Sequence, residues 1–160
     1  LVNEFSSFAR FPTAEPEPCD LRPIINESVA LYREGHPEIE FSARIANNLP
    51  QLNVDRQQIK QILINLIDNA ISVIHEQGRI TITADMDRKG ENVRITVADT
   101  GSGISNQDKP YLFEPDFTTK KSGMGLGLAI VSTIVADHQG RIITEDNHPH
   151  GAKFIIELPV

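Results

Sequence analysis

Two asparagines on one predicted helix are the first residues whose type and spacing could do chemistry. Asn65 and Asn69 are four positions apart, so on an α-helix both side chains project from the same side. A carboxamide oxygen can bind a hard cation, and a carboxamide nitrogen can donate to a phosphate. The pair is also typical of polar residues at the edge of an apolar helix face. The spacing alone therefore leaves both interpretations open.

An aspartate at the end of a predicted strand is the second candidate. Apolar residues alternate with polar ones over residues 93–97, and Asp99 continues the core-facing side of that alternation. A carboxylate placed there needs a buried donor. Gly101 and Gly103 follow it and permit a close backbone approach and unusual dihedral angles. The segment is also consistent with an ordinary turn that ends a strand.

A glycine-rich segment before the last predicted helix is the third candidate. Gly123, Gly125 and Gly127 stand at alternate positions, and exposed backbone N–H groups at a helix N-terminus suit a phosphate. Lys120 and Lys121 add positive charge beside them. The G-x-G-x-x-G spacing is absent and no Gly-Lys-Ser/Thr follows, so the segment is neither a dinucleotide fingerprint nor a P-loop. By itself such a loop is weak evidence for a phosphate site.

Hydrophobic periodicity predicts the elements that position these residues. The longest helix is expected from Asp55, a good N-cap, to about Glu76, with Asp68 on its solvent side. Its apolar face comprises Ile59, Ile62, Leu63, Leu66, Ile67, Ala70, Val73 and Ile74. The other predicted elements are helices over about 23–34 and 125–138, and strands over 39–45, 80–86, 93–97, 141–145 and 153–158. This order predicts an α+β fold with helices on one face of a mixed sheet.

Composition narrows the classes of function. The chain has 160 residues, 39% of them hydrophobic, which suits one domain with a buried core. Lys and Arg number 15 against 22 for Asp and Glu, a net charge of −7, so neither nucleic acid nor an anionic membrane surface is an expected partner. Cys19 is the single cysteine, which excludes an internal disulfide. No apolar run approaches the ~20 residues of a membrane span.

Residues 1–18 are expected to precede the domain proper. The first ten, Leu1 to Arg10, have apolar side chains at helical spacing, and the stretch from Pro12 to Pro18 holds three prolines in seven residues. Such a stretch predicts an extended linker. The chain also begins at a leucine, so we expect it to be part of a longer protein, with the main domain over residues 19–160.

Taken in order, these candidate segments, the last extended back to Leu112, resemble the N, G1, F and G2 boxes of the ATP-binding domain of sensor histidine kinases, in the gyrase, Hsp90, histidine kinase and MutL superfamily. The matching segments are residues 65–70, 99–103, 112–120 and 123–128, with 151–154 similar to the terminal G3 turn. Four ordered motifs are far more specific than any one of them. Residues 1–10, with 117–120, look like the NtrY and NtrB nitrogen-regulation branch.

The resemblance implies a two-layer α/β sandwich of the Bergerat type that holds ATP between helices and sheet. Asn69 would coordinate Mg²⁺ through its side-chain oxygen, and Asn65 would lie one turn earlier, near the phosphates. Asp99 would accept from the adenine amino group, with Gly101 and Gly103 close to the base. In this family the domain works with ATP and Mg²⁺ as its cofactors.

A mobile lid over the phosphates is the second implication. Lys120 would be the lid cation and, with Asn65, would act catalytically by holding the transferring phosphate. Phe113 and Phe117 are expected to anchor the lid rather than touch the substrate. The end of the lid would comprise Gly123, Gly125, Gly127 and Leu128.

The implied function is to present the γ-phosphate of Mg-ATP to a histidine on a separate dimerisation domain, for relay to a response-regulator aspartate in two-component signalling. Only the end of that dimerisation and phosphoacceptor domain is expected within residues 1–18. The expected partners are that domain and a response regulator similar to NtrX or NtrC. We expect the fragment to be monomeric, the full-length protein to be a homodimer, and the domain to be cytoplasmic, whether or not its parent is anchored in the inner membrane.

Some residues depart from the family pattern. No basic residue follows Ala70, where Ile71, Ser72 and Val73 stand instead, and Asp116 occupies a usually apolar position. The dipeptide His75-Glu76 imitates a phosphoacceptor motif, but it ends the long helix and points to solvent, so we do not expect it to be phosphorylated. The remaining histidines, which are expected at the surface, are His36, His138, His148 and His150.

Two other classes of function stay open. An ATP-hydrolysing clamp of the gyrase or MutL type carries a glutamate at the position of Asn65 to activate water, and an amide cannot serve as that base. A degenerate module that docks partners without chemistry is the other alternative. The glycines of residues 99–103 and 123–128 argue against it, whereas Asp116 and Ser72 leave it some support.

Overall fold

The computed structural model describes residues 13–114 and 127–160 and contains two sheets and three α-helices in that part of the chain. In chain order the elements are β1 (Glu17–Cys19), α2 (Leu21–Arg33), β2 (Ile39–Ile45), β3 (Leu52–Val54), α3 (Arg56–Ser72), β4 (Gly78–Met86), β5 (Asn92–Asp99), the 3₁₀ turn η1 (Lys109–Tyr111), α4 (Gly127–Asp137), β6 (Arg141–Asp146) and β7 (Ala152–Pro159). No helix in the described ranges is long and apolar enough to cross a membrane.

The main sheet has five strands in the order β2-β4-β5-β7-β6. Strand β2 runs parallel to β4, and the other neighbours are antiparallel, so the sheet is mixed as predicted. Side chains of β5 alternate between buried and half-buried along its whole length. In this register Asp99 lies opposite Ile80 of β4, at the end of the inward-facing row.

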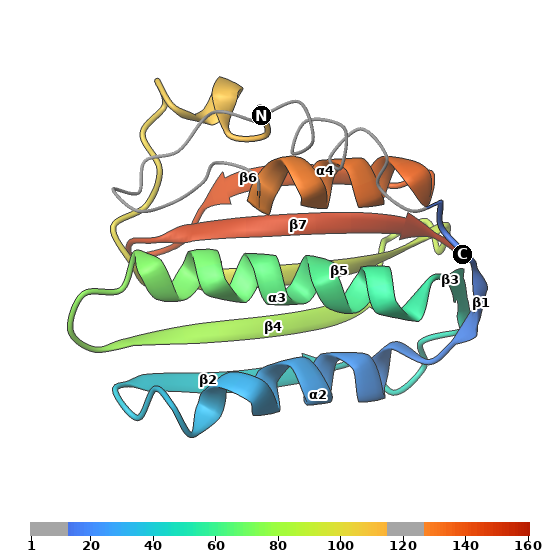
Figure 1. Cartoon of the computed structure of the whole chain (residues 1–160), viewed down its shortest axis with the longest axis horizontal. Helices are drawn as coiled ribbons and strands as arrows, with labels where there is room; N and C mark the ends of the chain where they lie inside the picture. Colours follow the sequence, from blue (N-terminus) through green and yellow to red (C-terminus); the bar gives the residue numbers. More distant parts are fainter. Residues whose placement is uncertain (1–12, 115–126) are drawn as a thin grey trace, which may run out of the picture.

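All three helices pack on one face of this sheet (Figure 1). Helix α2 contacts β2, α3 contacts β4 and β5, and α4 contacts β6. The space between the layers is filled by branched aliphatic side chains, of which Ile62, Leu66, Ile82 and Ile95 are at most 2% exposed. Burying each such side chain contributes about 1.5–3 kcal/mol. The predicted α+β sandwich with helices on one face is confirmed.

Helix α3 begins as predicted and ends four residues early. Asp55 is the N-cap, and its Oδ1 accepts from the Gln58 backbone N–H at 3.1 Å. The helix ends at Ser72 rather than near Glu76. The N–H groups of Val73 and Ile74 bond to carbonyls only three residues back, those of Ala70 and Ile71, at 3.4 and 3.1 Å, so the chain leaves the α-helical ladder there. The Val73 carbonyl accepts from the Ser102 N–H at 3.2 Å. The expectation that the helix reaches His75 is therefore wrong, although His75 is exposed as predicted.

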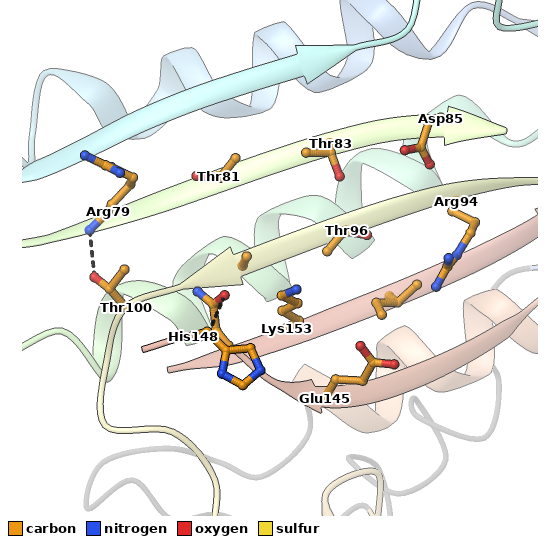
Figure 2. Close-up of a pocket in the computed structure, with 13 residues that line it drawn as sticks. Arg79, Thr81, Thr83, Asp85, Arg94, Thr96, Thr100, Glu145, His148 and Lys153 are labelled. Atoms are coloured by element: carbon orange, nitrogen blue, oxygen red, sulfur yellow. Dashed lines mark hydrogen bonds between the residues drawn. The ribbon is translucent and has the colours of Figure 1, made fainter. Parts of the chain in front are cut away.

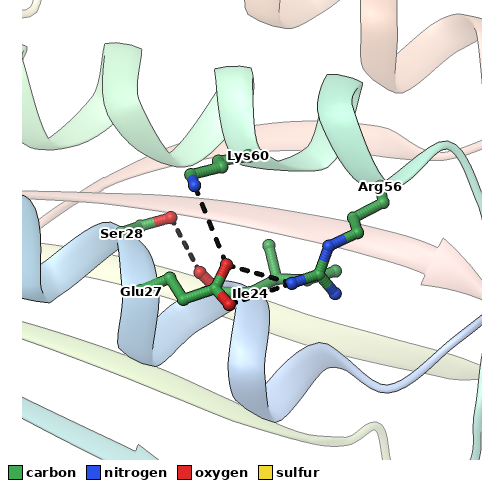
Figure 3. Close-up of polar contacts among 5 residues, drawn as sticks. All are labelled: Ile24, Glu27, Ser28, Arg56 and Lys60. Atoms are coloured by element: carbon green, nitrogen blue, oxygen red, sulfur yellow. Dashed lines mark hydrogen bonds and ion pairs between the residues drawn. The ribbon is translucent and has the colours of Figure 1, made fainter.

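An ion-pair cluster links α2 to α3 on the solvent side (Figure 3). The Arg56 guanidinium donates to both Glu27 carboxylate oxygens, at 3.0 and 3.1 Å, and the Lys60 ammonium lies 3.7 Å from the same carboxylate. All three side chains are partly exposed, so each pair contributes at most about 1 kcal/mol. The cluster therefore adds only modestly to the packing of α2 beside α3, which rests mainly on buried apolar side chains such as Ile24 and Ile59.

A small second sheet was not predicted. Strand β1 pairs antiparallel with β3, so that Cys19 lies opposite Leu52 and Glu17 opposite Val54. Glu17 and Pro18, which were expected in an extended linker, are thus part of this sheet. Cys19 is buried, and burial raises the pKa of its thiol.

Candidate nucleotide-binding site

The carboxylate of Asp99 is the buried acid of the site. Asp99 is the last residue of β5, and it is only 2% exposed. Oδ1 accepts from the Gly101 N–H at 2.9 Å and from the Ala152 N–H at 3.2 Å. Burial raises the pKa of Asp99, and these two hydrogen bonds oppose the rise. Oδ2 accepts no hydrogen bond from residues 13–114 or 127–160, so one carboxylate oxygen stays available to a ligand.

The turn before β7 packs against the backbone carbonyl of Asp99. Gly151 has a φ of +107°, and a Cβ on this residue would lie 2.0 Å from the Asp99 carbonyl oxygen. The Asn147 side-chain amide donates to that same carbonyl at 2.7 Å. The sequence motif at residues 151–154 thus meets the 99–103 motif directly, and the contact requires a glycine.

The loop after Asp99 packs on the C-terminal end of α3. A Cβ on Gly101 would lie 2.5 Å from the carbonyl oxygen of Val73, which is the C-cap of that helix. Gly103 has a φ of +78°. Since Val73 lies one helical turn after Asn69, the structure brings the predicted adenine end of the site next to the predicted metal ligand.

Asn65 contacts the start of α4. Its Nδ2 donates to the Gly127 carbonyl oxygen at 3.1 Å, and its Oδ1 accepts from the Gln61 side-chain amide at 2.8 Å. Two predicted site residues 62 positions apart in sequence are therefore hydrogen-bonded. Gln61 was not singled out from the sequence, although its position one turn before Asn65 places it on the same side of the helix.

Asn69 has a half-exposed side chain that makes no hydrogen bond to the described residues. Its backbone carbonyl accepts from the Ser72 hydroxyl at 2.7 Å. Ser72, the residue near which relatives were expected to carry a basic side chain, is therefore engaged with the backbone of α3. Asp68 is exposed, as predicted.

The residues predicted to form a lid are only partly described. Lys120, Gly123 and Gly125, with Asp116 and Phe117, lie outside the described residues. Leu128 is half-buried against the core at the start of α4. Phe113 packs edge-on against Phe154, with ring centroids 6.5 Å apart, which agrees with an anchoring role for Phe113.

His138 corrects one expectation. It was predicted at the surface, but it is 6% exposed. Its Nε2 accepts from the Asp55 backbone N–H at 3.0 Å, and its Nδ1 lies 2.8 Å from the Ile134 carbonyl, which can only accept. The imidazole is therefore neutral, with its proton on Nδ1. Burial follows because the last turn of α4 lies against the N-cap of α3, a tertiary contact without any local sequence signal.

A polar hollow of about 480 Å³ lies on the other face of the sheet (Figure 2). Its floor is formed by short side chains of the central strands, and charged side chains stand around it. The lining residues include Arg79, Thr81, Thr83, Arg94, Thr96, Glu145 and Lys153. Of the predicted nucleotide-site residues that the structure describes, none lines this hollow: Asn65 and Asn69 are on α3, Gly127 and Leu128 on α4, and Asp99, Gly101 and Gly103 at or after the end of β5.

Comparison with known proteins decides the family. A family model described as histidine kinase-, DNA gyrase B-, and HSP90-like ATPase matches residues 54–160. The chain belongs to this ATPase family. The predicted resemblance is thereby confirmed, and residues 65–70 and 99–103 of the ATPase domain lie within the matched range.

Curated relatives of this ATPase domain include sensor kinases. The nitrogen regulation protein NtrY of Azorhizobium caulinodans is 39% identical over 153 residues, which cover 91% of this chain and 20% of NtrY. The sensor histidine kinase ZraS of Escherichia coli is 38% identical over 143 residues, covering 88% of this chain and 30% of ZraS. The chain thus spans between a fifth and a third of the length of these relatives.

Solved structures agree with this assignment. The catalytic domain of histidine kinase ThkA has a TM-score of 0.81 and 39% identity, covering 91% of this chain and 95% of that one. ThkA in complex with the response regulator TrrA has a TM-score of 0.82 at 34% identity, over 99% and 46% of the two chains. Full-length ShkA in complex with AMPPNP has a TM-score of 0.84 at 32% identity, over 99% and 35%. This is a sensor histidine kinase catalytic domain.

Proposed function

We propose that this domain binds Mg-ATP and presents the γ-phosphate to a histidine on a separate helical domain of its parent protein. The observation that carries the proposal is Asp99, a buried carboxylate that has one oxygen held by backbone N–H groups and the other available. A fixed acceptor of this kind suits the amino group of adenine, whereas guanine presents a carbonyl there. Gly101 lets the backbone lie close to such a base.

The residues beside Asp99 fit the phosphates and a metal ion. Asn69 carries a carboxamide without a partner among the described residues, and its oxygen is a donor atom that Mg²⁺ accepts. Asn65 lies one turn earlier on α3 and contacts the N-terminus of α4. A helix N-terminus stabilises negative charge such as that of a phosphate. Bound Mg²⁺ would neutralise phosphate charge during transfer. Lys120, Gly123 and Gly125 are proposed to complete the phosphate contacts.

The proposed phosphoacceptor and relay partners follow from the relatives. ThkA has been captured with a response regulator, which supports a response regulator as the final acceptor here. The similarity to NtrY supports a regulator of the NtrX or NtrC type and a role in nitrogen regulation. The parent protein is proposed to be a homodimer whose kinase domain is cytoplasmic.

ATP hydrolysis by a gyrase-type mechanism is less well supported. Asn65 carries a carboxamide, which is not basic enough to act as a general base toward water, and its nitrogen donates to the Gly127 carbonyl. Asp68, the neighbouring acid, is exposed on the solvent side of α3. A phosphotransfer reaction with an external histidine needs no such base on this helix.

Two measurements test the proposal. Calorimetry should show Mg-dependent binding of ATP and much weaker binding of GTP; equal affinities would contradict the adenine assignment. The domain should then be mixed with the helical phosphoacceptor domain of its parent and radiolabelled ATP. Acid-labile label is expected on the helical domain alone. Label on His75 of the isolated ATPase domain would overturn the proposed division of labour.

A further inference from the structure

We propose that Gln61 is a positioning residue: it orients the Asn65 carboxamide so that Asn65 ties α3 to the first residue of α4. This inference deepens the proposed function, because it concerns the phosphate end of the same site. The chain of contacts runs from the Gln61 amide to Asn65 Oδ1 (2.8 Å), and from Asn65 Nδ2 to the Gly127 carbonyl (3.1 Å).

The chemistry of the acceptor fixes the direction of this chain. A backbone carbonyl can only accept, so the Asn65 atom facing Gly127 must be the NH₂ group. The carboxamide oxygen then faces Gln61, which must donate through Nε2. Asn65 Oδ1 accepts no other hydrogen bond from the described residues, so Gln61 is the partner that reinforces the orientation set by the Gly127 carbonyl. Gln61 is partly buried, so the donor is also shielded from competing water.

The contact matters because α4 is tied to α3 at both of its ends. At the far end, His138 accepts from the Asp55 N–H at 3.0 Å. Residues 55–65 of α3 span about 15 Å and residues 127–138 span about 16 Å at helical rise. The two contacts are therefore separated by similar distances along the two helices, and the helices run antiparallel between these contacts. Releasing Asn65 frees the N-terminal turn of α4 while the His138 contact stays in place.

This orientation also gives the two asparagines different proposed ligands, phosphate for Asn65 and the metal ion for Asn69. Since Gln61 occupies the Asn65 oxygen, Asn65 offers only N–H groups toward the start of α4. Such groups suit phosphate oxygens and cannot bind a cation. Asn69, whose carboxamide has no partner among the described residues, is left as the metal ligand. A change at Gln61 is therefore expected to disturb phosphate binding and to leave adenine binding intact.

Two variants and one control test the proposal. Gln61→Glu replaces the donor by an acceptor, so the Asn65 amide should reverse and turn its oxygen toward the Gly127 carbonyl. Gln61→Met removes the donor without adding charge. Gln57→Glu is the matched control, because Gln57 is exposed and lies one turn earlier on the same side of α3. It adds the same negative charge without touching Asn65.

The first readout needs no nucleotide. Hydrogen exchange of the amides of residues 130–132, in the N-terminal part of α4, should be several-fold faster in Gln61→Glu and Gln61→Met than in wild type. Exchange in the central strands should not change, and Gln57→Glu should behave as wild type. Equal exchange in all four proteins would overturn the proposal, whatever the domain binds.

The second readout is binding by calorimetry and NMR titration. The affinity for Mg-ATP should fall about tenfold in Gln61→Glu and about threefold in Gln61→Met, the range expected for one hydrogen bond. The affinity for adenosine should be unchanged in both. A loss of adenosine and ATP affinity together would indicate general damage and refute a positioning role. If wild type itself fails to bind Mg-ATP, the proposed function fails, and the exchange experiment still decides the role of Gln61.

Discussion

Replacing Gly151 by alanine should destabilise the domain much more than the same replacement at Gly90. Both glycines have a positive φ, +107° and +70°, so an alanine Cβ strains the backbone at either site. At Gly90 no atom lies within 4 Å of the added Cβ. The cost there is backbone strain alone, about 1–2 kcal/mol.

At Gly151 the surroundings add a second cost. The added Cβ would lie 2.0 Å from the Asp99 carbonyl oxygen, whereas ordinary contact begins at 3.4 Å, so the turn and the end of β5 must move apart by about 1.4 Å. That shift lengthens the Asn147 bond to the Asp99 carbonyl and the Ala152 bond to its carboxylate, each contributing about 1 kcal/mol. With the strain, the expected loss is about 4 kcal/mol, or roughly 10 °C in Tm.

Denaturant unfolding of the two variants and calorimetry with ATP measure both consequences. Gly151→Ala should lose stability and also bind ATP at least tenfold more weakly, because Asp99 has moved. Gly90→Ala, in the remote β4–β5 hairpin, should bind ATP like wild type. The reasoning is refuted if Gly151→Ala is no less stable than Gly90→Ala, or if it retains full ATP affinity.

Three further predictions concern single side chains. Burial raises the pKa of Asp99, so the contribution of Asp99 to the free energy of unfolding falls as pH rises from its unfolded to its folded pKa. ATP affinity should instead fall as pH drops through the folded pKa, because Asp99 becomes protonated. Asp99→Asn should abolish this pH dependence of ATP affinity in calorimetry and weaken ATP binding at neutral pH by about 1–3 kcal/mol. Asn69→Ala should weaken ATP binding in Mg²⁺ and leave binding in EDTA unchanged; an equal loss in both would exclude Asn69 as the ligand. His138→Ala should lower the free energy of unfolding by about 2–4 kcal/mol. His138→Gln should recover part of this loss because its amide oxygen can accept from the Asp55 N–H, and His148→Ala, at an exposed position, should have no effect. Equal thermal stability of the three variants would contradict a stabilising contact between His138 and Asp55.

Local patterns predicted the regular elements well because each pattern reports on one periodic face. The alternation of apolar and polar residues in β5 correctly predicted that Asp99 lies on the buried side of the strand. The N-cap of α3 was predictable because Asp55 precedes an unbroken apolar stripe. The three-residue strands β1 and β3 were missed, since three residues are too few to define a period.

The remaining features depend on tertiary contacts. Helix α3 ends at Ser72, and the Val73 carbonyl then accepts from the Ser102 N–H, a contact between residues 29 positions apart that no window along the chain contains. The burial of His138 and the requirement for glycine at residue 151 have the same origin. Gln61 looks like an ordinary polar residue of a helix surface, and only the position of the Gly127 carbonyl gives its amide a function.

The candidate site is assembled on α3 through contacts that each involve a backbone group. The Asp55 N–H binds His138, Asn65 binds the Gly127 carbonyl, and the Val73 carbonyl binds Ser102. The start of α3, its middle and its end thus each hold a different part of the chain. Each of these contacts has a backbone group on at least one side, so each depends on where the chain runs as well as on the side chains of Asn65 and His138. Substitutions that move the backbone, above all at glycines 101 and 151, should therefore damage nucleotide binding more than most exchanges of exposed side chains around the site.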